Sequence, residues 1–129
     1  MLEQSHTFSG ISVDDLEEAR RFYAGVLGFP TQDDFGGFRV ELPGGAELWV
    51  YDKPNHSPAT FTVLNFVVPD IDAAVDGLNA AGVTTKIYPD DQFRTDEKGI
   101  ARGRSVGRGP DIAWFQDPAG NVLSVLQPA

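Results

Sequence analysis

Cysteine is absent from this 129-residue chain, and histidine occurs only at His6 and His56. Without thiols the chain has no disulfide, no thiolate nucleophile and no thiolate metal ligand, so a metal site would need histidine or carboxylate ligands. No apolar run approaches the ~18 residues of a membrane span. The first residues also lack the basic and apolar regions of a signal peptide. We therefore expect a cytoplasmic protein with no membrane partner.

Basic residues are scarce: 10 Lys and Arg stand against 19 Asp and Glu, giving a net charge of -9. Nucleic-acid affinity depends largely on neutralising phosphates with cationic side chains, so no nucleic-acid partner is expected. Half of the basic residues fall within one short segment, namely Arg94, Lys98, Arg102, Arg104 and Arg108. This segment is a candidate for a separate role.

An internal repeat is the most informative pattern. The sequence VDDLEEA at 13–19 reappears as VPDIDAA at 68–74. Each copy predicts the end of a strand and the start of a helix, with Asp15 and Asp70 as the capping residues. A glycine follows each apolar helical face as a terminator, first Gly28 and later Gly82.

Strand patterns surround both predicted helices. They cover residues 8–13, 35–42 and 46–51 in the first half, and 60–68, 83–87, 112–115 and 122–126 in the second half. Each half is thus a βα unit followed by further strands. We predict a single domain over 1–129, with one module at 1–53, a proline-bounded linker at 54–58 and a second module at 59–129.

Nearly the whole chain resembles the vicinal oxygen chelate superfamily, which includes glyoxalase I, bleomycin-resistance proteins and extradiol dioxygenases. The motifs that carry this resemblance are Val13-x-Asp15-Leu16-Glu17-x-Ala19-x-x-Phe22-Tyr23-x-x-Val26-Leu27-Gly28-Phe29, Phe66-x-Val68-x-Asp70-Ile71 and Phe115-x-Asp117-Pro118-x-Gly120-Asn121. The resemblance implies an α+β fold in which two βαβββ modules form a curved, open mixed sheet around a cavity, with the helices on the outer face. It also implies a homodimer.

Members of this family generally hold a divalent metal with His and Glu ligands, and here the corresponding positions differ. The first-strand position is Phe8, its counterpart in the second module is Val63, and the final-strand glutamate is replaced by Ser124. The fourth position falls on Leu48 or one residue away at Glu47. Because Phe and Val have no lone pairs to donate, we predict no metal site and no other cofactor.

A displaced metal site remains an alternative. His6 lies two residues before Phe8 on the same strand face, and Glu41 or Glu47 is a possible second ligand. Zinc normally needs at least three protein ligands, and these candidates align only loosely. His56 is predicted to be a surface residue of the linker.

Apolar residues at the former ligand positions favour a cavity that encloses an organic molecule. Alternation along the strands leaves open whether Leu48 or Trp49, Phe38 or Arg39, and Trp114 or Phe115 face that cavity. The candidate ligand-binding residues are Phe8, Phe38, Arg39, Leu48, Trp49, Tyr51, Val63, Phe93, Arg94 and Ser124. For each aromatic, simple core packing is the competing interpretation.

The segment 88–109 is longer than most loops without regular structure and is a candidate lid. Arg94 or Arg104 is suited to clamping a carboxylate or phosphate, which favours an anionic ligand. The acidic balance of the whole chain instead favours a cationic compound. Sequence alone leaves both open, together with a solvated loop whose charges cancel locally.

These observations predict a metal-independent small-molecule-binding protein of the bleomycin-resistance type that sequesters an organic or antibiotic-like ligand. The first alternative is a lyase, isomerase or dioxygenase of the same fold, using a displaced metal or acid–base groups such as Glu41, Glu47, Asp96 or Glu97. The second is a protein-interaction module in which a sheet edge recruits another chain.

Overall fold

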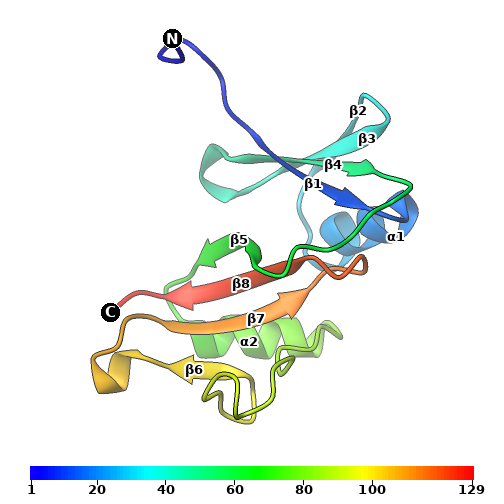
Figure 1. Cartoon of the computed structure of the whole chain (residues 1–129). Helices are drawn as coiled ribbons and strands as arrows, with labels where there is room; N and C mark the ends of the chain where they lie inside the picture. Colours follow the sequence, from blue (N-terminus) through cyan, green and yellow to red (C-terminus); the bar gives the residue numbers. More distant parts are fainter. The chain divides into compact units, whose positions relative to one another are not determined.

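The computed structural model describes all residues, Met1–Ala129, as two compact units, Met1–Pro58 (unit 1) and Ala59–Ala129 (unit 2). Each unit has the element order βαβββ and contains one open, four-stranded mixed sheet (Figure 1). The predicted α+β fold with two βαβββ modules is therefore confirmed. None of the helices has the length and apolar character needed to cross a membrane.

Unit 1 builds its sheet in the order β1-β4-β3-β2. β1 runs parallel to β4, and the other neighbouring strands are antiparallel. The elements are β1 (Ser9–Val13), α1 (Leu16–Arg20) continuing as a π-helical segment (Arg21–Val26), β2 (Thr31–Asp34), β3 (Gly37–Glu41) and β4 (Glu47–Asp52).

The predicted cap of α1 is present. Asp15 has extended backbone angles, and its side chain accepts a hydrogen bond from the Glu18 backbone N–H at 3.1 Å. This bond satisfies one of the free N–H groups in the first helical turn. Gly28, with φ 77°, follows the helix in the left-handed conformation that glycine adopts readily.

The two faces of the unit 1 sheet differ in burial. Phe38, Leu48 and Val50 are fully buried or nearly so. The ring of Phe38 packs near Tyr23 from the helical segment, with the ring centroids 6.4 Å apart. Because side chains alternate along a strand, Arg39 and Trp49 lie on the opposite face. This register leaves the face away from α1 available for a site.

Unit 2 repeats the plan, with the strand order β5-β8-β7-β6. Its elements are β5 (Thr62–Val67), α2 (Ile71–Ala80), β6 (Ile100–Arg102), β7 (Asp111–Gln116) and β8 (Val122–Gln127). Helix α2 covers one face of this sheet (Figure 1), where Ile71, Val75 and Phe115 are buried. The side chain of Asp70 caps α2 by accepting from the Ala73 N–H at 3.1 Å.

The expected strand at 83–87 is wrong, because no strand forms there and the place beside β7 is taken by β6. Residue Thr85 is fixed by its side chain, whose hydroxyl donates to the Lys98 carbonyl at 2.6 Å. Gly99 lies so close to Thr85 that a Cβ atom on residue 99 would be 2.0 Å from the backbone carbonyl oxygen of Thr85. The segment 88–109 is therefore not a structureless loop. Strand β2 was also missed, because no strand was predicted over its four residues.

Candidate functional site

A pocket of about 280 Å³ lies on the face of the unit 1 sheet that points away from α1. Its lining residues are His6, Phe8, Asp34, Phe35, Arg39, Glu47 and Trp49. They come from the chain just before β1, from β3 and β4, and from the end of β2 and its turn. The pocket combines three aromatic rings with two carboxylates and one guanidinium.

Glu47 is held at the pocket by two neighbours. Oε1 accepts a hydrogen bond from His6 Nε2 at 2.9 Å, and Oε2 accepts one from Arg39 Nη1 at 3.0 Å. These two hydrogen bonds, that of His6 first, lower the pKa of Glu47 below its ordinary value of 4.5. Both oxygens of this carboxylate are thus engaged by groups of the protein itself.

Phe35 has an unusual backbone for an aromatic residue. It lies in the turn between β2 and β3 with φ 44°, followed by Gly36 with φ 80°. Two successive positive φ angles suit a tight hairpin turn, where Asn-Gly or Asp-Gly are preferred and a bulky residue is strained. The side chain is nevertheless 93% exposed and lines the pocket. Nothing in its packing explains a phenylalanine here.

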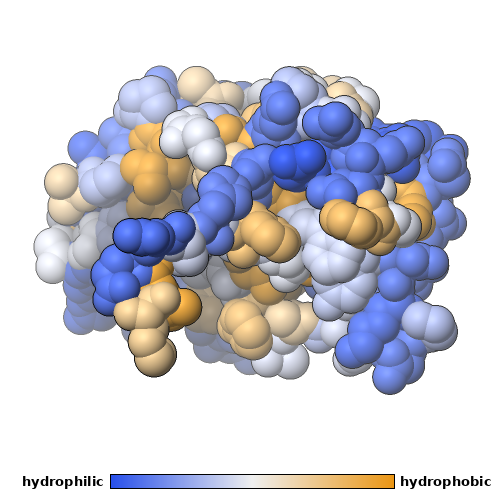
Figure 2. All heavy atoms as spheres, turned by 90° about the horizontal axis from the view of Figure 1, so that it is seen from above, coloured by the Kyte–Doolittle hydropathy of each residue, from blue (hydrophilic) through white to orange (hydrophobic).

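Trp49 forms one wall and is fixed from two sides. Its indole Nε1 donates to the Asp34 carbonyl at 3.2 Å, and its ring stacks on Tyr51 with centroids 4.6 Å apart. Phe8 is 61% exposed and lies on the same face. In Figure 2, apolar residues appear as small patches within a largely hydrophilic surface.

The divalent metal that the family resemblance implies does not fit these residues. No three His, Cys, Asp or Glu side chains are grouped so as to hold a metal ion. The candidate ligands of a displaced metal site were His6, Glu41 and Glu47. His6 and Glu47 are hydrogen-bonded to each other, and Arg39 donates a hydrogen bond to the other oxygen of Glu47. Leu48 is buried on the other face, so Glu47 is the residue that the pocket face presents.

In unit 2 the remaining family positions are also unlike metal ligands. Ser124 is fully buried and donates a hydrogen bond to the Asn65 side-chain oxygen at 2.5 Å. Val63 lies in β5 where the register with β8 shifts. Neither residue has the carboxylate or imidazole that a divalent cation would need.

An aromatic cluster of Tyr88, Phe93 and Trp114 packs the segment after α2 against β7. The ring centroids of Phe93 and Trp114 are 4.8 Å apart, and those of Tyr88 and Trp114 are 5.3 Å apart. Phe93 therefore has packing partners within unit 2. Arg94 is exposed and makes no ion pair, whereas Arg104 lies 3.7 Å from the Asp111 carboxylate.

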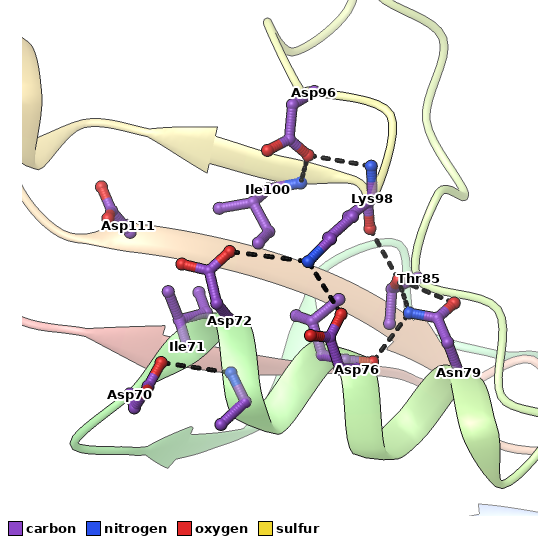
Figure 3. Close-up of polar contacts among 12 residues, drawn as sticks. Asp70, Ile71, Asp72, Asp76, Asn79, Thr85, Asp96, Lys98, Ile100 and Asp111 are labelled. Carbon is purple, nitrogen blue, oxygen red and sulfur yellow. Dashed lines mark hydrogen bonds and ion pairs between the residues drawn. The ribbon is translucent and has the colours of Figure 1, made fainter.

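Ion pairs hold the segment 94–104 on α2 and β7. Arg102 makes two hydrogen bonds to Asp72, at 2.9 and 2.7 Å. Figure 3 shows Lys98 reaching both Asp72 and Asp76 of α2, at 3.8 and 2.8 Å. The Asp96 side chain accepts from the backbone N–H groups of Lys98 and Ile100, which shapes the turn before β6. The cluster of basic residues seen in the sequence is therefore largely neutralised by acidic neighbours.

One contact was not foreseen. The Ser12 hydroxyl and Nδ1 of His56 are 2.7 Å apart, which ties the linker to β1. No sequence pattern indicated this contact, because the two residues lie 44 positions apart in the chain. Of the predicted site residues, the pocket brings together Phe8, Arg39 and Trp49, with Tyr51 stacked beside it, while Phe38 and Leu48 belong to the core.

Comparison with solved structures gives matches across almost the entire chain. An antibiotic binding protein, TnmS3 from Streptomyces sp. CB03234, is 24% identical with a TM-score of 0.64, and the match covers 98% of each chain. The fosfomycin resistance protein FosX from Listeria monocytogenes has a TM-score of 0.70 at 14% identity, covering 98% of this chain and 94% of that one. A glyoxalase family protein from Bacillus anthracis is 20% identical with a TM-score of 0.66 over 100% of both chains.

These likenesses establish the fold rather than a ligand. A search of curated proteins gave no significant match. The profile described as the Glyoxalase/Bleomycin resistance protein/Dioxygenase superfamily matches residues 4–125. This chain therefore belongs to the glyoxalase, bleomycin resistance protein and dioxygenase superfamily.

Proposed function

We propose that this protein binds and sequesters a small organic molecule through the unit 1 pocket, without a metal ion. The observation that carries the proposal is the lining of that pocket, where Phe8, Phe35 and Trp49 surround a carboxylate already occupied by Arg39. Ligand pockets are typically apolar with a few fixed polar groups. The resemblance to an antibiotic binding protein supports an antibiotic-like ligand.

The size of the pocket limits what it encloses. At about 280 Å³ it lies near the lower end of the range for small-molecule sites, about 300–1,000 Å³. It would hold one fused ring system, or one part of a larger compound. Tyr51, which stacks on Trp49, stays a proposal for a secondary contact with such a compound. The candidates Val63, Phe93, Arg94 and Ser124 belong to unit 2 and stay separate proposals there.

Acid–base catalysis has less support than binding. Glu47 is engaged on both oxygens, and Asp96 accepts hydrogen bonds that build a turn. A general base must reach the proton that it removes, with an acceptor available for it. We therefore propose binding without chemical conversion as the function.

Calorimetric titration with acridone, a neutral compound of three fused rings, tests this function. We expect binding that Trp49→Ala removes and that Trp114→Ala, the matched control in unit 2, leaves intact. Loss of binding in Trp114→Ala alone would instead move the site to the aromatic cluster of unit 2. Failure of acridone and its charged analogues to bind would contradict the proposed function.

The proposal includes a homodimer, as the family resemblance implies, and the cytoplasmic location that we expect from the sequence. Native mass spectrometry of protein purified without chelator measures subunit number and metal content together. A metal-free dimer is the expected result. One tightly held metal per subunit would contradict the metal-independent function.

A further inference from the structure

We infer that the unit 1 pocket selects ligands that carry a positive charge on or beside an aromatic system, and that Asp34 is the residue that pairs with this charge. The inference rests on the proposed function, because it names the ligand class of the same pocket. The sequence leaves open whether the ligand is a cation or an anion, and this inference favours the cation.

The polar groups of the pocket differ in how far they are already satisfied. Glu47 accepts from His6 and from Arg39, one hydrogen bond on each oxygen. Asp34 has only a long approach from Arg39, with Nε 3.7 Å from Oδ2, and no hydrogen bond reaches its Oδ1. Its side chain is 30% exposed at the pocket. Asp34 is thus the carboxylate with acceptor capacity left for a ligand.

Arg39 is the one arginine or lysine of the pocket lining, and it is directed at carboxylates of the protein. Its Nη1 donates to Glu47, and its Nε faces Asp34. Among Asp34, Glu47 and Arg39, two carboxylates against one guanidinium leave one negative charge. An anionic ligand would have to displace these contacts, whereas a cationic ligand would complete them.

The aromatic walls favour the same kind of ligand. Cations are attracted to the faces of aromatic rings, and tryptophan is the most favourable of them. Trp49 and Asp34 are held together, because the indole donates to the Asp34 carbonyl at 3.2 Å. A flat cation lying on Trp49 would therefore place its charge close to the Asp34 carboxylate. The net charge of -9 would assist its approach at low ionic strength.

The anionic alternative depended on the basic segment of unit 2. There, Lys98, Arg102 and Arg104 all face aspartates at 3.9 Å or less. Arg94 and Arg108, the other basic residues of this segment, make no ion pair, and both are exposed and lie outside the pocket lining. The structure therefore offers a built site for a cation and only exposed surface groups for an anion.

Three ligands of equal ring count separate these cases: proflavine, which is a cation at pH 8, acridone, which is neutral, and acridine-9-carboxylate, which is an anion. Their dissociation constants are measured by calorimetry on the wild-type protein and on Asp34→Asn. Asp33→Asn is the matched control, because Asp33 is the neighbouring carboxylate, is 82% exposed and pairs with Arg20 at 2.7 Å on the other face of β2. Asp34→Glu tests rescue by a retained charge.

We expect proflavine to bind at least about tenfold more tightly than acridone, as for a charge-assisted contact. Asp34→Asn should abolish this preference by weakening proflavine binding more than acridone binding, and Asp33→Asn and Asp34→Glu should retain the preference. Rising salt should weaken proflavine more than acridone. Equal binding of all three compounds, a preference for the anion, or a preference that survives Asp34→Asn would overturn the inference and leave the proposed function standing. If none of the three compounds binds, both the proposed binding function and this inference are contradicted.

Discussion

Arg39 and Glu47 are joined across the neighbouring strands β3 and β4, with Arg39 Nη1 3.0 Å from Glu47 Oε2. The guanidinium supplies the positive charge beside Glu47, one of the two residues, with Leu48, on which the family resemblance places the fourth ligand position. An internal cation in this place satisfies the carboxylate through hydrogen bonds, so the carboxylate has no need of a metal ion.

Replacing Arg39 by glutamine should raise the pKa of Glu47 toward its ordinary value of 4.5, with the His6 hydrogen bond still holding it somewhat lower. Because the folded-state pKa is depressed, these contacts stabilise the fold above the ordinary pKa and lose their effect as the pH falls through the folded value. Carboxyl-carbon NMR titration measures the shift. Arg20→Gln, which removes a cation from the opposite face, is the control. An unchanged Glu47 titration in Arg39→Gln would refute the assigned role of Arg39.

The sequence predicted the modules well because their signals are local. Both helix caps, Asp15 and Asp70, form the hydrogen bonds that the repeat predicted. The positive φ values of Gly28 and Gly82 likewise agree with their roles as terminators. Capping residues and glycines act through backbone geometry within a few positions, so one sequence is enough to recognise them.

Strand register was beyond the reach of the sequence. Both Leu48-x-Val50 and Trp49-x-Tyr51 are suited to a buried face, and only the packing of Phe38 on the helix decides between them. The short strand β6 was missed for a related reason. Its three residues lie far along the chain from α2, and the mostly β-branched segment at 83–87 was the stronger local pattern.

Phe8 and Phe38 should respond in opposite ways to truncation. Phe38 is fully buried, so Phe38→Ala should cost roughly 3–5 kcal/mol of unfolding free energy. Phe8 is largely exposed, so Phe8→Ala should change stability by no more than about 0.5 kcal/mol while weakening acridone binding. Urea unfolding and calorimetric titration measure the two effects. A Phe38→Ala variant that keeps its stability but loses acridone binding would show that Phe38 is a ligand-binding residue rather than a core residue.

Asp72 and Asp76 offer a matched pair of carboxylates on α2. Arg102 makes two hydrogen bonds to Asp72, whereas Asp76 pairs only with Lys98. We expect Asp72→Asn to speed hydrogen exchange at the amides of β6, because the hydrogen bonds from Arg102 of β6 to α2 are lost. Asp76→Asn should have a smaller effect. Exchange measured by NMR distinguishes them.

The same link gives a dependence on pH. Hydrogen bonding to Arg102 lowers the pKa of Asp72 from its ordinary value of 3.8. Protection of β6 should therefore be full above that value and should fall as the pH decreases through the lowered one. In Asp72→Asn this acid-dependent loss should be absent. Equal exchange in the two variants, or the same acid dependence in Asp72→Asn, would show that other contacts hold β6.

Phe35 should show a conflict between stability and binding. Asparagine tolerates a positive φ and forms the preferred Asn-Gly turn, so Phe35→Asn should stabilise unit 1 by roughly 1 kcal/mol. The same change removes an aromatic wall from the pocket and should weaken acridone binding. Phe35→Ala separates the two effects, because it also removes the ring but keeps a residue unsuited to φ 44°. Equal loss of binding in both variants, with a stability gain only in Phe35→Asn, would show that the Phe35 ring contributes to binding at a cost in stability. Wild-type binding in either variant would show that Phe35 is not part of the site.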